Sequence, residues 1–283
     1  MRIVIKFAGA VLEDAEQVAF LSRHVANLAR HGHEILVIHG GGRLFTSLLK
    51  RMGIESQFVA GLRVTDRETR DAAIMVFGGL LNKRLAASIT AAGQPAVGIS
   101  AADAASFLAA PLVHNDEEGS LGFVGYLTAV NVAFLESLWR EKLLPVAACL
   151  GQGSDGELYN INADHMAAAC AEFINADHLI FLTDVAGVLH GEDVLSAISF
   201  EQVENLVQTR VVSGGMVLKL EAAKRALEGG VQEVHIVGGD SAGPILDPQL
   251  FTVSSDRNSV SSLPGTRVLR PSLPPEFASP AFV

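Results

Sequence analysis

Two isolated lysines lie at positions where they could bind a phosphate group. Lys6 directly follows the apolar residues Ile3–Ile5, and Lys219 ends the segment GGMVLK, whose two glycines precede a helical pattern. A lysine at the end of a strand or on a helix is more often simply exposed to solvent. If these two point into a cleft, however, they can neutralise the charge on a phosphoryl group during its transfer.

Glycines mark the ends of several predicted strands, at Ala8-Gly9, at Gly40–Gly42 and at Gly238-Gly239. A glycine between a strand and a helix allows backbone amides to approach a phosphate closely. Taken singly, each of these glycines is more simply explained by a tight turn. The sequence contains no GxxxxGK[ST] loop, which excludes a P-loop kinase. It also contains no complete GxGxxG motif after a strand.

Polar side chains also alternate in the segment YNINAD. Asn160 and Asn162 share one face if the segment is extended, and Asp164 then opens a helix. Capping of that helix would explain one of these residues but not all three. Because an asparagine side chain both donates and accepts hydrogen bonds, the pair suits a small polar ligand.

A lone arginine lies in the segment GLRVTD. Thr65 together with Glu68 fits a capping box for the helix that follows, so a structural role is sufficient for Thr65. Capping does not account for Arg63, whose guanidinium matches the geometry of a carboxylate. Arg63 is therefore a candidate for binding an acidic substrate.

The sequence lacks the motifs of metal-dependent enzymes and of serine hydrolases. The nine histidines show no HExxH or comparable ligand spacing, so no metal centre is predicted, and without GxSxG there is no serine nucleophile elbow. Cys149 and Cys170 form no CxxC pair and read as buried thiols, which fits a reducing cytoplasm.

Composition narrows the function classes further. The 283 residues are 49% hydrophobic and 18% charged, which excludes disorder as the dominant state. A net charge of −10 argues against nucleic-acid binding but not against binding ATP, because a few local cations suffice for a phosphate. Lys6 interrupts the first apolar run, and the stretch 80–113 is too often polar, so neither a signal peptide nor a membrane span is expected.

Short β-branched runs alternate with helical patterns along most of the chain. This alternation predicts an α/β protein with a mainly parallel sheet covered by helices, whose ligands bind beyond the carboxyl ends of the strands. The composition of the segment 112–126 predicts a hairpin turn between short strands. Two lobes are expected to meet near residue 175. The proline-rich tail from residue 271 is expected to be poorly ordered. The predicted strands are 3–5, 35–38, 96–99, 145–149, 178–182 and 234–237, and the predicted helices are 18–28, 44–52, 68–92, 163–174 and 216–227.

These pieces, taken in order, resemble the amino-acid kinase family from Ile3 to about Gly239, and Gly265–Val268 is similar to that family's closing strand. The resemblance implies an open three-layer αβα sandwich. An N-lobe, residues 1–175, would bind an acylated amino acid and dimerise, and a C-lobe, residues 176–270, would bind ATP. The motifs that carry it are Lys6–Gly9, HGGG at 39–42, GLRVTD at 61–66, LNKRL at 81–85, LGFVG at 121–125, NINAD at 160–164, LTDVAGVL at 182–189 and GGMVLK at 214–219.

The resemblance also implies roles for individual residues. Lys6 and Lys219 would be the phosphate lysines, and Asp164 would lie between them and orient both. Arg63 and Asn160 would hold the substrate's α-carboxylate, with Asn162 beside them, and Gly41 and Gly42 would lie along the substrate and the transferring group. The nucleotide, ATP with Mg²⁺, would contact Gly9, Asp184, Val185, Gly187, Val188, Leu189, Val212 and Ser213, and no resident metal site is implied.

Within the family, GLRVTD and NINAD favour N-acetyl-L-glutamate as the phosphate acceptor and a place in arginine biosynthesis. A related kinase acting on N-succinylglutamate, an acylated aminoadipate, aspartate or carbamate remains an alternative. So does a non-catalytic paralogue that binds a metabolite and regulates a partner, although Lys6, Asp164 and Lys219 together argue against it. The departures from the family are Ala8, where a glycine is usual, the alanine-rich segment 100–110, where relatives carry more polar residues, and the poorly matching segment 240–263.

The resemblance further implies an assembly. Arginine-inhibited hexamers of this family carry a helix ahead of the first strand, and only Met1 and Arg2 precede Ile3 here. We therefore expect little inhibition by arginine and a C₂ homodimer instead of a hexameric ring. The apolar run Ile74–Leu80, which contains the small residues Gly78 and Gly79, is the expected interface.

Overall fold

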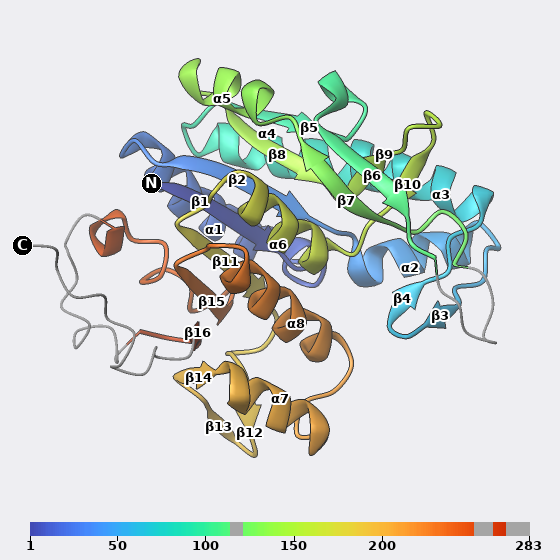
Figure 1. Cartoon of the computed structure of the whole chain (residues 1–283). Helices are drawn as coiled ribbons and strands as arrows, with labels where there is room; N and C mark the ends of the chain where they lie inside the picture. The colour runs from blue at the N-terminus through green and yellow to red at the C-terminus, as the bar shows by residue number, and fades with distance from the viewer. Residues whose placement is uncertain (114–120, 252–262, 270–283) are drawn as a thin grey trace, which may run out of the picture.

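The computed structural model describes residues 1–113, 121–251 and 263–269, and one large sheet runs through them (Figure 1). Its strand order is β14-β16-β15-β11-β1-β2-β8-β5, and every neighbouring pair is parallel except β15 with β16. The strands are β1 Arg2–Phe7, β2 Glu34–His39, β5 Ala96–Ile99, β8 Leu144–Ala148, β11 His178–Thr183, β14 Ala197–Ser199, β15 Glu233–Gly238 and β16 Thr266–Leu269. The predicted mainly parallel sheet is confirmed.

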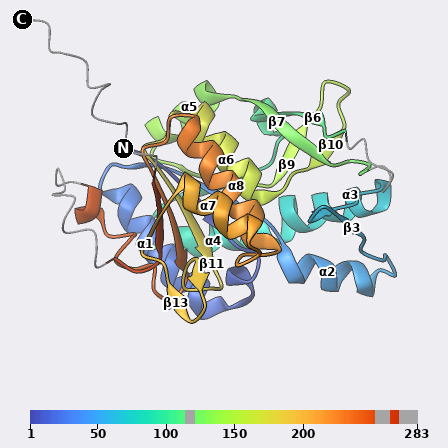
Figure 2. The ribbon, with the colours of Figure 1, turned by 60° about the horizontal axis from the view of Figure 1, so that its bottom comes forward.

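Helices cover both faces of this sheet, which makes the three layers of an αβα sandwich (Figures 1 and 2). Helices α1 (Ala15–Arg30) and α4 (Asn82–Ala91) pack on one face, and α6 (Ala163–Phe173) and α8 (Gly215–Glu228) on the other. Side chains of a strand point alternately to the two faces. In β1, Ile3 and Ile5 therefore join the core under α1, whereas Val4 joins the core under α6.

The helix predicted over 68–92 is one continuous helical run with an unexpected middle. It comprises α3 (Arg67–Ala73), a π-helical segment (Ile74–Leu81) and α4. Its length and hydropathy would allow it to cross a membrane, and half of its most apolar window is buried inside the fold.

Smaller sheets lie beside the large one. A four-stranded sheet has the order β10-β9-β6-β7, with β6 Phe107–Pro111, β7 Gly125–Val130, β9 Leu150–Gln152 and β10 Leu158–Asn160. Two hairpins, β3 (Phe58–Val59) with β4 (Leu62–Arg63) and β12 (Leu189–His190) with β13 (Asp193–Val194), complete the strands. Strands β6 and β7 pair antiparallel as predicted, and the turn at 114–120 lies outside the described residues.

The remaining helices connect these sheets. They are α2 Gly42–Arg51, α5 Val132–Arg140 and α7 Phe200–Gln208, with 3-10 turns at Val11–Glu13, Asp103–Ala105 and Pro248–Phe251. The closing strand predicted at Gly265–Val268 is β16. The tail predicted to be poorly ordered lies outside the described residues, as do residues 252–262 of the divergent segment 240–263.

Candidate active site

Three charged side chains meet at the centre of the molecule. Lys6 Nζ lies 2.8 Å from Asp164 Oδ1, and Lys219 Nζ lies 2.9 Å from the same oxygen. The three side chains are 8%, 7% and 11% exposed for Lys6, Lys219 and Asp164, so this group is almost removed from water. Two cations that share one carboxylate oxygen leave one net positive charge in the interior, which favours binding an anion.

Local folding explains why these residues meet. Lys6 follows Val4 on the face of β1 that packs under α6. Asp164 lies in the first turn of α6, where Asn162 caps the helix by accepting from the backbone N–H groups of Asp164 and His165 at 2.9 and 3.1 Å. Lys219 lies in the second turn of α8, the helix that packs beside α6. Capping therefore explains Asn162, and this cap fixes the position of Asp164.

The proximity of these charges shifts their pKa values. Burial acts to raise the pKa of Asp164, but the ammonium groups of Lys6 and Lys219 outweigh it and hold this pKa well below its usual range. Burial and the neighbouring Lys6 lower the pKa of Lys219 to about 8, even though Asp164 acts in the opposite direction. Asp164 is thus an ionised anchor for two cations and a poor proton acceptor at neutral pH.

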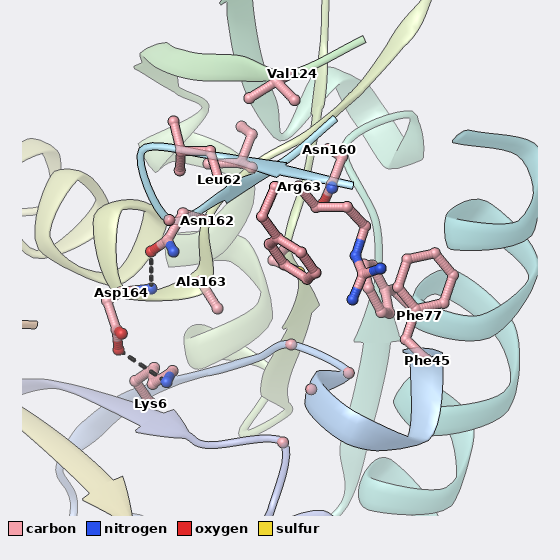
Figure 3. A pocket seen from close by; sticks show the side chains of 18 residues that line it. Lys6, Phe45, Leu62, Arg63, Phe77, Val124, Asn160, Asn162, Ala163 and Asp164 are labelled. Atoms are coloured by element: carbon pink, nitrogen blue, oxygen red, sulfur yellow. Dashed lines mark hydrogen bonds and ion pairs between the residues drawn. The ribbon is translucent and has the colours of Figure 1, made fainter. Parts of the chain in front are cut away.

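A cavity of about 210 Å³ opens beside Lys6 and Asp164 (Figure 3). The substrate-binding residues predicted from the sequence, Gly41, Gly42, Arg63, Asn160 and Asn162, all line it, and so does Gly9. Its other lining residues are Gly40, Phe45, Phe58, Gly61, Leu62, Phe77, Val124, Cys149, Ile161 and Ala163. The cavity thus has a cationic end at Lys6 and a second cation at Arg63, which suits an elongated anion.

Two glycine turns form the floor of the cavity and touch each other. A methyl group at Gly9 would lie 2.5 Å from the Cα and N atoms of Gly42, and one at Gly41 would lie 2.1 Å from the ring of Phe77. Both turns therefore require glycine. Ala8 is compatible with this arrangement, because its φ is not positive and its methyl group packs in the core under α1.

Aromatic rings and hydroxyls hold Arg63 in place. Its guanidinium carbon lies 5.0 Å from the ring centroid of Phe45 and 4.6 Å from that of Phe58. Its nitrogens donate to the hydroxyls of Thr46, at 2.7 Å, and Ser56. A guanidinium fixed in this way has its orientation set before any ligand arrives.

Asn160 is positioned from the neighbouring loop. Its side-chain nitrogen donates to the hydroxyl of Thr65 at 3.1 Å, and this hydroxyl donates to the Arg63 carbonyl at 2.8 Å. The capping box predicted at Thr65 and Glu68 is wrong. Asp66 caps α3 instead, because its carboxylate accepts from the Thr69 amide at 2.7 Å while Thr65 is fully buried.

The motif LNKRL supports the glycine turn after β2. Asn82 donates to the ring of His39 at 3.1 Å and to the Val146 carbonyl at 2.8 Å. Burial lowers the pKa of His39 to about 4, so this ring is neutral at pH 7. His39 and Asn82 therefore fix the turn from behind and take no part in proton transfer.

Most residues predicted to bind ATP lie outside this cavity, and of them only Gly9 lines it. Asp184 follows β11, and its carboxylate accepts from Arg43 at 2.9 Å. Gly187 and Val188 pack against β16, where the Val188 amide donates to the Thr266 hydroxyl at 2.8 Å. Val185 belongs to the loop after β11 and Leu189 begins β12, whereas Val212 and Ser213 precede Gly214, the N-cap of α8. Of these residues, Asp184 directly follows β11, and Val185 lies beside Gly238 at the carboxyl end of β15.

Sequence reasoning missed the aromatic residues of the cavity and Arg43. Phe45 and Phe77 form an edge-to-face pair with centroids 4.6 Å apart, and Phe58 is 57% exposed at the cavity mouth. An aromatic residue at helical spacing is more often part of a core, so no pattern marked them. The one available signal was Phe58 itself, an apolar residue beside the turn Ala60-Gly61.

Comparison with known proteins gives a consistent result. The model of the amino acid kinase family matches residues 1–238. The chain is 49% identical to an acetylglutamate kinase of Koribacter versatilis over 89% of this chain and 95% of that protein. It is 44% identical to an acetylglutamate kinase of Acidobacterium capsulatum over 87% of this chain and 94% of that protein.

Solved structures support the same fold. A protein of Streptococcus mutans superimposes with a TM-score of 0.75 at 26% identity, over 95% of this chain and 98% of that one. N-acetylglutamate synthase of Neisseria gonorrhoeae, solved with coenzyme A and N-acetylglutamate, gives a TM-score of 0.80 at 22% identity over 96% of this chain and 60% of the synthase. At that identity the second likeness concerns the fold alone.

Proposed function

This chain belongs to the amino acid kinase family, and we propose that it transfers the γ-phosphoryl group of ATP to the side-chain carboxylate of N-acetyl-L-glutamate, a step of arginine biosynthesis. The observation that carries the proposal is the pair of buried lysines on one oxygen of Asp164, at the end of a cavity whose other end contains Arg63. The similarity to curated acetylglutamate kinases supports the choice of substrate.

The chemistry explains the composition of the site. The attacking carboxylate has a reference pKa of about 4.3 and is already ionised at pH 7, so no general base is needed. The obstacle is repulsion between two anions. Lys6 and Lys219 offset this repulsion and stabilise the charge that spreads over the phosphoryl oxygens, while Asp164 holds both ammonium groups in position. In-line positioning of the two substrates supplies the rest.

The two substrates occupy opposite sides of the lysines in this proposal. All residues that line the cavity have sequence positions from 6 to 164 and therefore belong to the N-lobe, residues 1–175. This supports binding of the amino acid to the N-lobe. ATP, entering as its Mg²⁺ complex, binds to the C-lobe at 176–270 with Gly9, Asp184, Val185, Gly187, Val188, Leu189, Val212 and Ser213 around it. Because β11 pairs with β1, the two lobes share one sheet and meet at the lysines.

Trapping the acyl phosphate with hydroxylamine tests the proposal. The assay compares N-acetyl-L-glutamate, N-succinyl-L-glutamate, L-glutamate and L-aspartate in the presence of Mg²⁺ and ATP. We expect ATP-dependent hydroxamate with the highest kcat/KM for N-acetyl-L-glutamate. A higher kcat/KM for another acceptor would identify a related kinase, and no hydroxamate from any of the four would favour a non-catalytic regulatory protein.

Replacement of Arg63 by lysine is expected to raise KM for the amino acid at least about tenfold and KM for ATP little. A lysine keeps the charge but loses the planar fork, its two hydroxyl partners and its stacking between Phe45 and Phe58. Initial rates with each substrate varied in turn separate the two constants. Arg67→Lys, at the first position of α3 and outside the cavity, is the matched control. Equal changes in both KM values would contradict the assignment.

The rate is also expected to depend on the protonation of Lys219. Its pKa is lowered to about 8, and only the protonated form is a cation. The value of kcat/KM should therefore decrease as the pH rises through about 8. The decrease in kcat should occur at higher pH, because bound ATP phosphates favour the ammonium form. Rate profiles from pH 6 to 10 test this, and a kcat/KM that stays constant up to pH 9.5 would contradict it.

The apolar π-helical segment supports a homodimer. Met75 is 58% exposed and Leu80 is 36% exposed, and a methyl group at Gly79 would touch nothing, so this surface is apolar and open. We expect light scattering to give twice the 29.8 kDa of one chain. The double substitution of Met75 and Leu80 by aspartate should give the monomer mass, whereas Met52→Asp, at another exposed apolar position, should not. A monomeric wild type would contradict this assembly.

A further inference from the structure

Three metal-ligating side chains lie at the opposite end of the sheet from the cavity. His178 and Glu233 are the first residues of β11 and β15 and are direct partners in the parallel register of these two strands. His235 lies two residues after Glu233 and therefore on the same face of the sheet. One ligand atom from each of the three lies within 4.8 Å of the other two.

The separations fit one cation. The Nε2 atom of His235 lies 3.2 Å from the Oε2 atom of Glu233, and the Nδ1 atom of His178 lies 3.9 Å from that same oxygen. Ligands at about 2.0–2.1 Å around a tetrahedral zinc ion are roughly 3.4 Å apart. Glu233 is still 36% exposed, so an ion can reach the group and a water can complete the coordination.

One of the three ligand atoms is buried without a hydrogen-bond partner among the described residues. This atom is Nδ1 of His178. Buried polar atoms are nearly always satisfied, and leaving one unpaired is unfavourable. A metal ion bound between His178 and Glu233 would satisfy this atom.

The surroundings hold the two rings in position. Phe251 packs edge-on against His178 with ring centroids 4.9 Å apart, and the rings of His178 and His235 stack at 6.4 Å. Asp177 adds a second nearby carboxylate, which offsets the positive charge of Arg267, the register partner of His235 on β16. The ligands are thus partly fixed before an ion binds, which lowers the entropic cost of binding.

We propose that His178, Glu233 and His235 bind a divalent transition metal ion, of the zinc type, which links β11 to β15. Two nitrogen ligands favour Zn²⁺, Co²⁺ or Ni²⁺ over Mg²⁺, so this site is distinct from the Mg²⁺ that accompanies ATP. The ion stabilises the fold, because it binds only where β11 and β15 are paired in the native state. The three residues lie near the amino ends of these strands, away from the candidate active site.

Cobalt absorption tests the site directly. The full chain is stripped with EDTA, dialysed, and titrated with Co²⁺ in the presence of excess Mg²⁺. We expect visible d–d bands with one Co²⁺ bound per chain, and Zn²⁺ should abolish these bands. His178→Ala, His235→Ala and the nearly isosteric Glu233→Gln should each weaken Co²⁺ binding at least tenfold. His31→Ala, which removes an exposed histidine bonded to the Asn27 carbonyl, should leave it unchanged.

Thermal unfolding provides a second readout that does not depend on activity. Zn²⁺ should raise the Tm of the wild type and of His31→Ala but not that of the three ligand variants, because only a native state that binds the ion is stabilised. Circular dichroism of the metal-free variants establishes that they are folded. Absence of d–d bands in the wild type, or unchanged Co²⁺ binding in the folded ligand variants, would overturn the proposal.

Discussion

Replacement of Lys219 by alanine is expected to lower kcat at least about a hundredfold, a loss of roughly 2.7 kcal/mol of transition-state stabilisation. The ammonium group lies 2.9 Å from Asp164 and is nearly buried, so its charge acts on the phosphoryl group in a medium that screens it weakly. Lys6→Ala should have an effect of the same size, because its ammonium group contacts the same oxygen. Single-turnover formation of the hydroxamate measures the chemical step in each variant.

The two lysines should differ in which KM they change. Lys6 lines the cavity and Lys219 does not, so KM for the amino acid should rise more in Lys6→Ala than in Lys219→Ala. Lys224→Ala is the matched control, because Lys224 lies five residues further along α8 and pairs with Glu204 at the surface. A Lys219→Ala variant with near-normal kcat would exclude a role for this residue in phosphoryl transfer.

The sequence predicts the parts of the site that consist of charged residues and glycines. Lys6 directly follows an apolar run, helix capping does not account for Arg63, Lys219 is marked by the motif GGMVLK, and the glycines of HGGG end a strand. Each of these breaks a local pattern and can therefore be seen without a structure. The order of the strands cannot be seen in this way, because the pairing of β1 with β11 joins residues more than 170 positions apart.

The residues that sequence analysis missed have the residue types expected for the segments that contain them, so nothing in the sequence distinguishes them. Phe45 and Phe77 lie in helices among other apolar residues, and only the packed structure shows that their rings border the cavity. The segment Ile74–Leu81 is apolar throughout, so it has no polar face from which its π-helical period could be recognised. His178 and Glu233 are brought together by strand register alone, which explains why the spacing of the histidines indicated no metal ligands.

Asp164→Asn should separate the structural role of the carboxylate from its role in catalysis. The substitution preserves the shape of the side chain but leaves two ammonium groups adjacent and buried without a counter-charge. Breaking a buried ion pair in this way costs on the order of 3–5 kcal/mol. We therefore expect a clear decrease in the free energy of unfolding, measured with urea, together with a kcat lowered at least as much as in either lysine variant.

A second substitution distinguishes the two effects. In the double variant Asp164→Asn, Lys219→Met, one of the unpaired cations is gone, so most of the lost stability should return, whereas kcat should stay low. In the single variant, loss of the carboxylate that raises the pKa of Lys219 should move this pKa below about 8, and any residual kcat/KM should decrease at a lower pH than in the wild type. An Asp164→Asn enzyme with unchanged stability and kcat would mean that the shared carboxylate neither organises the lysines nor supports phosphoryl transfer.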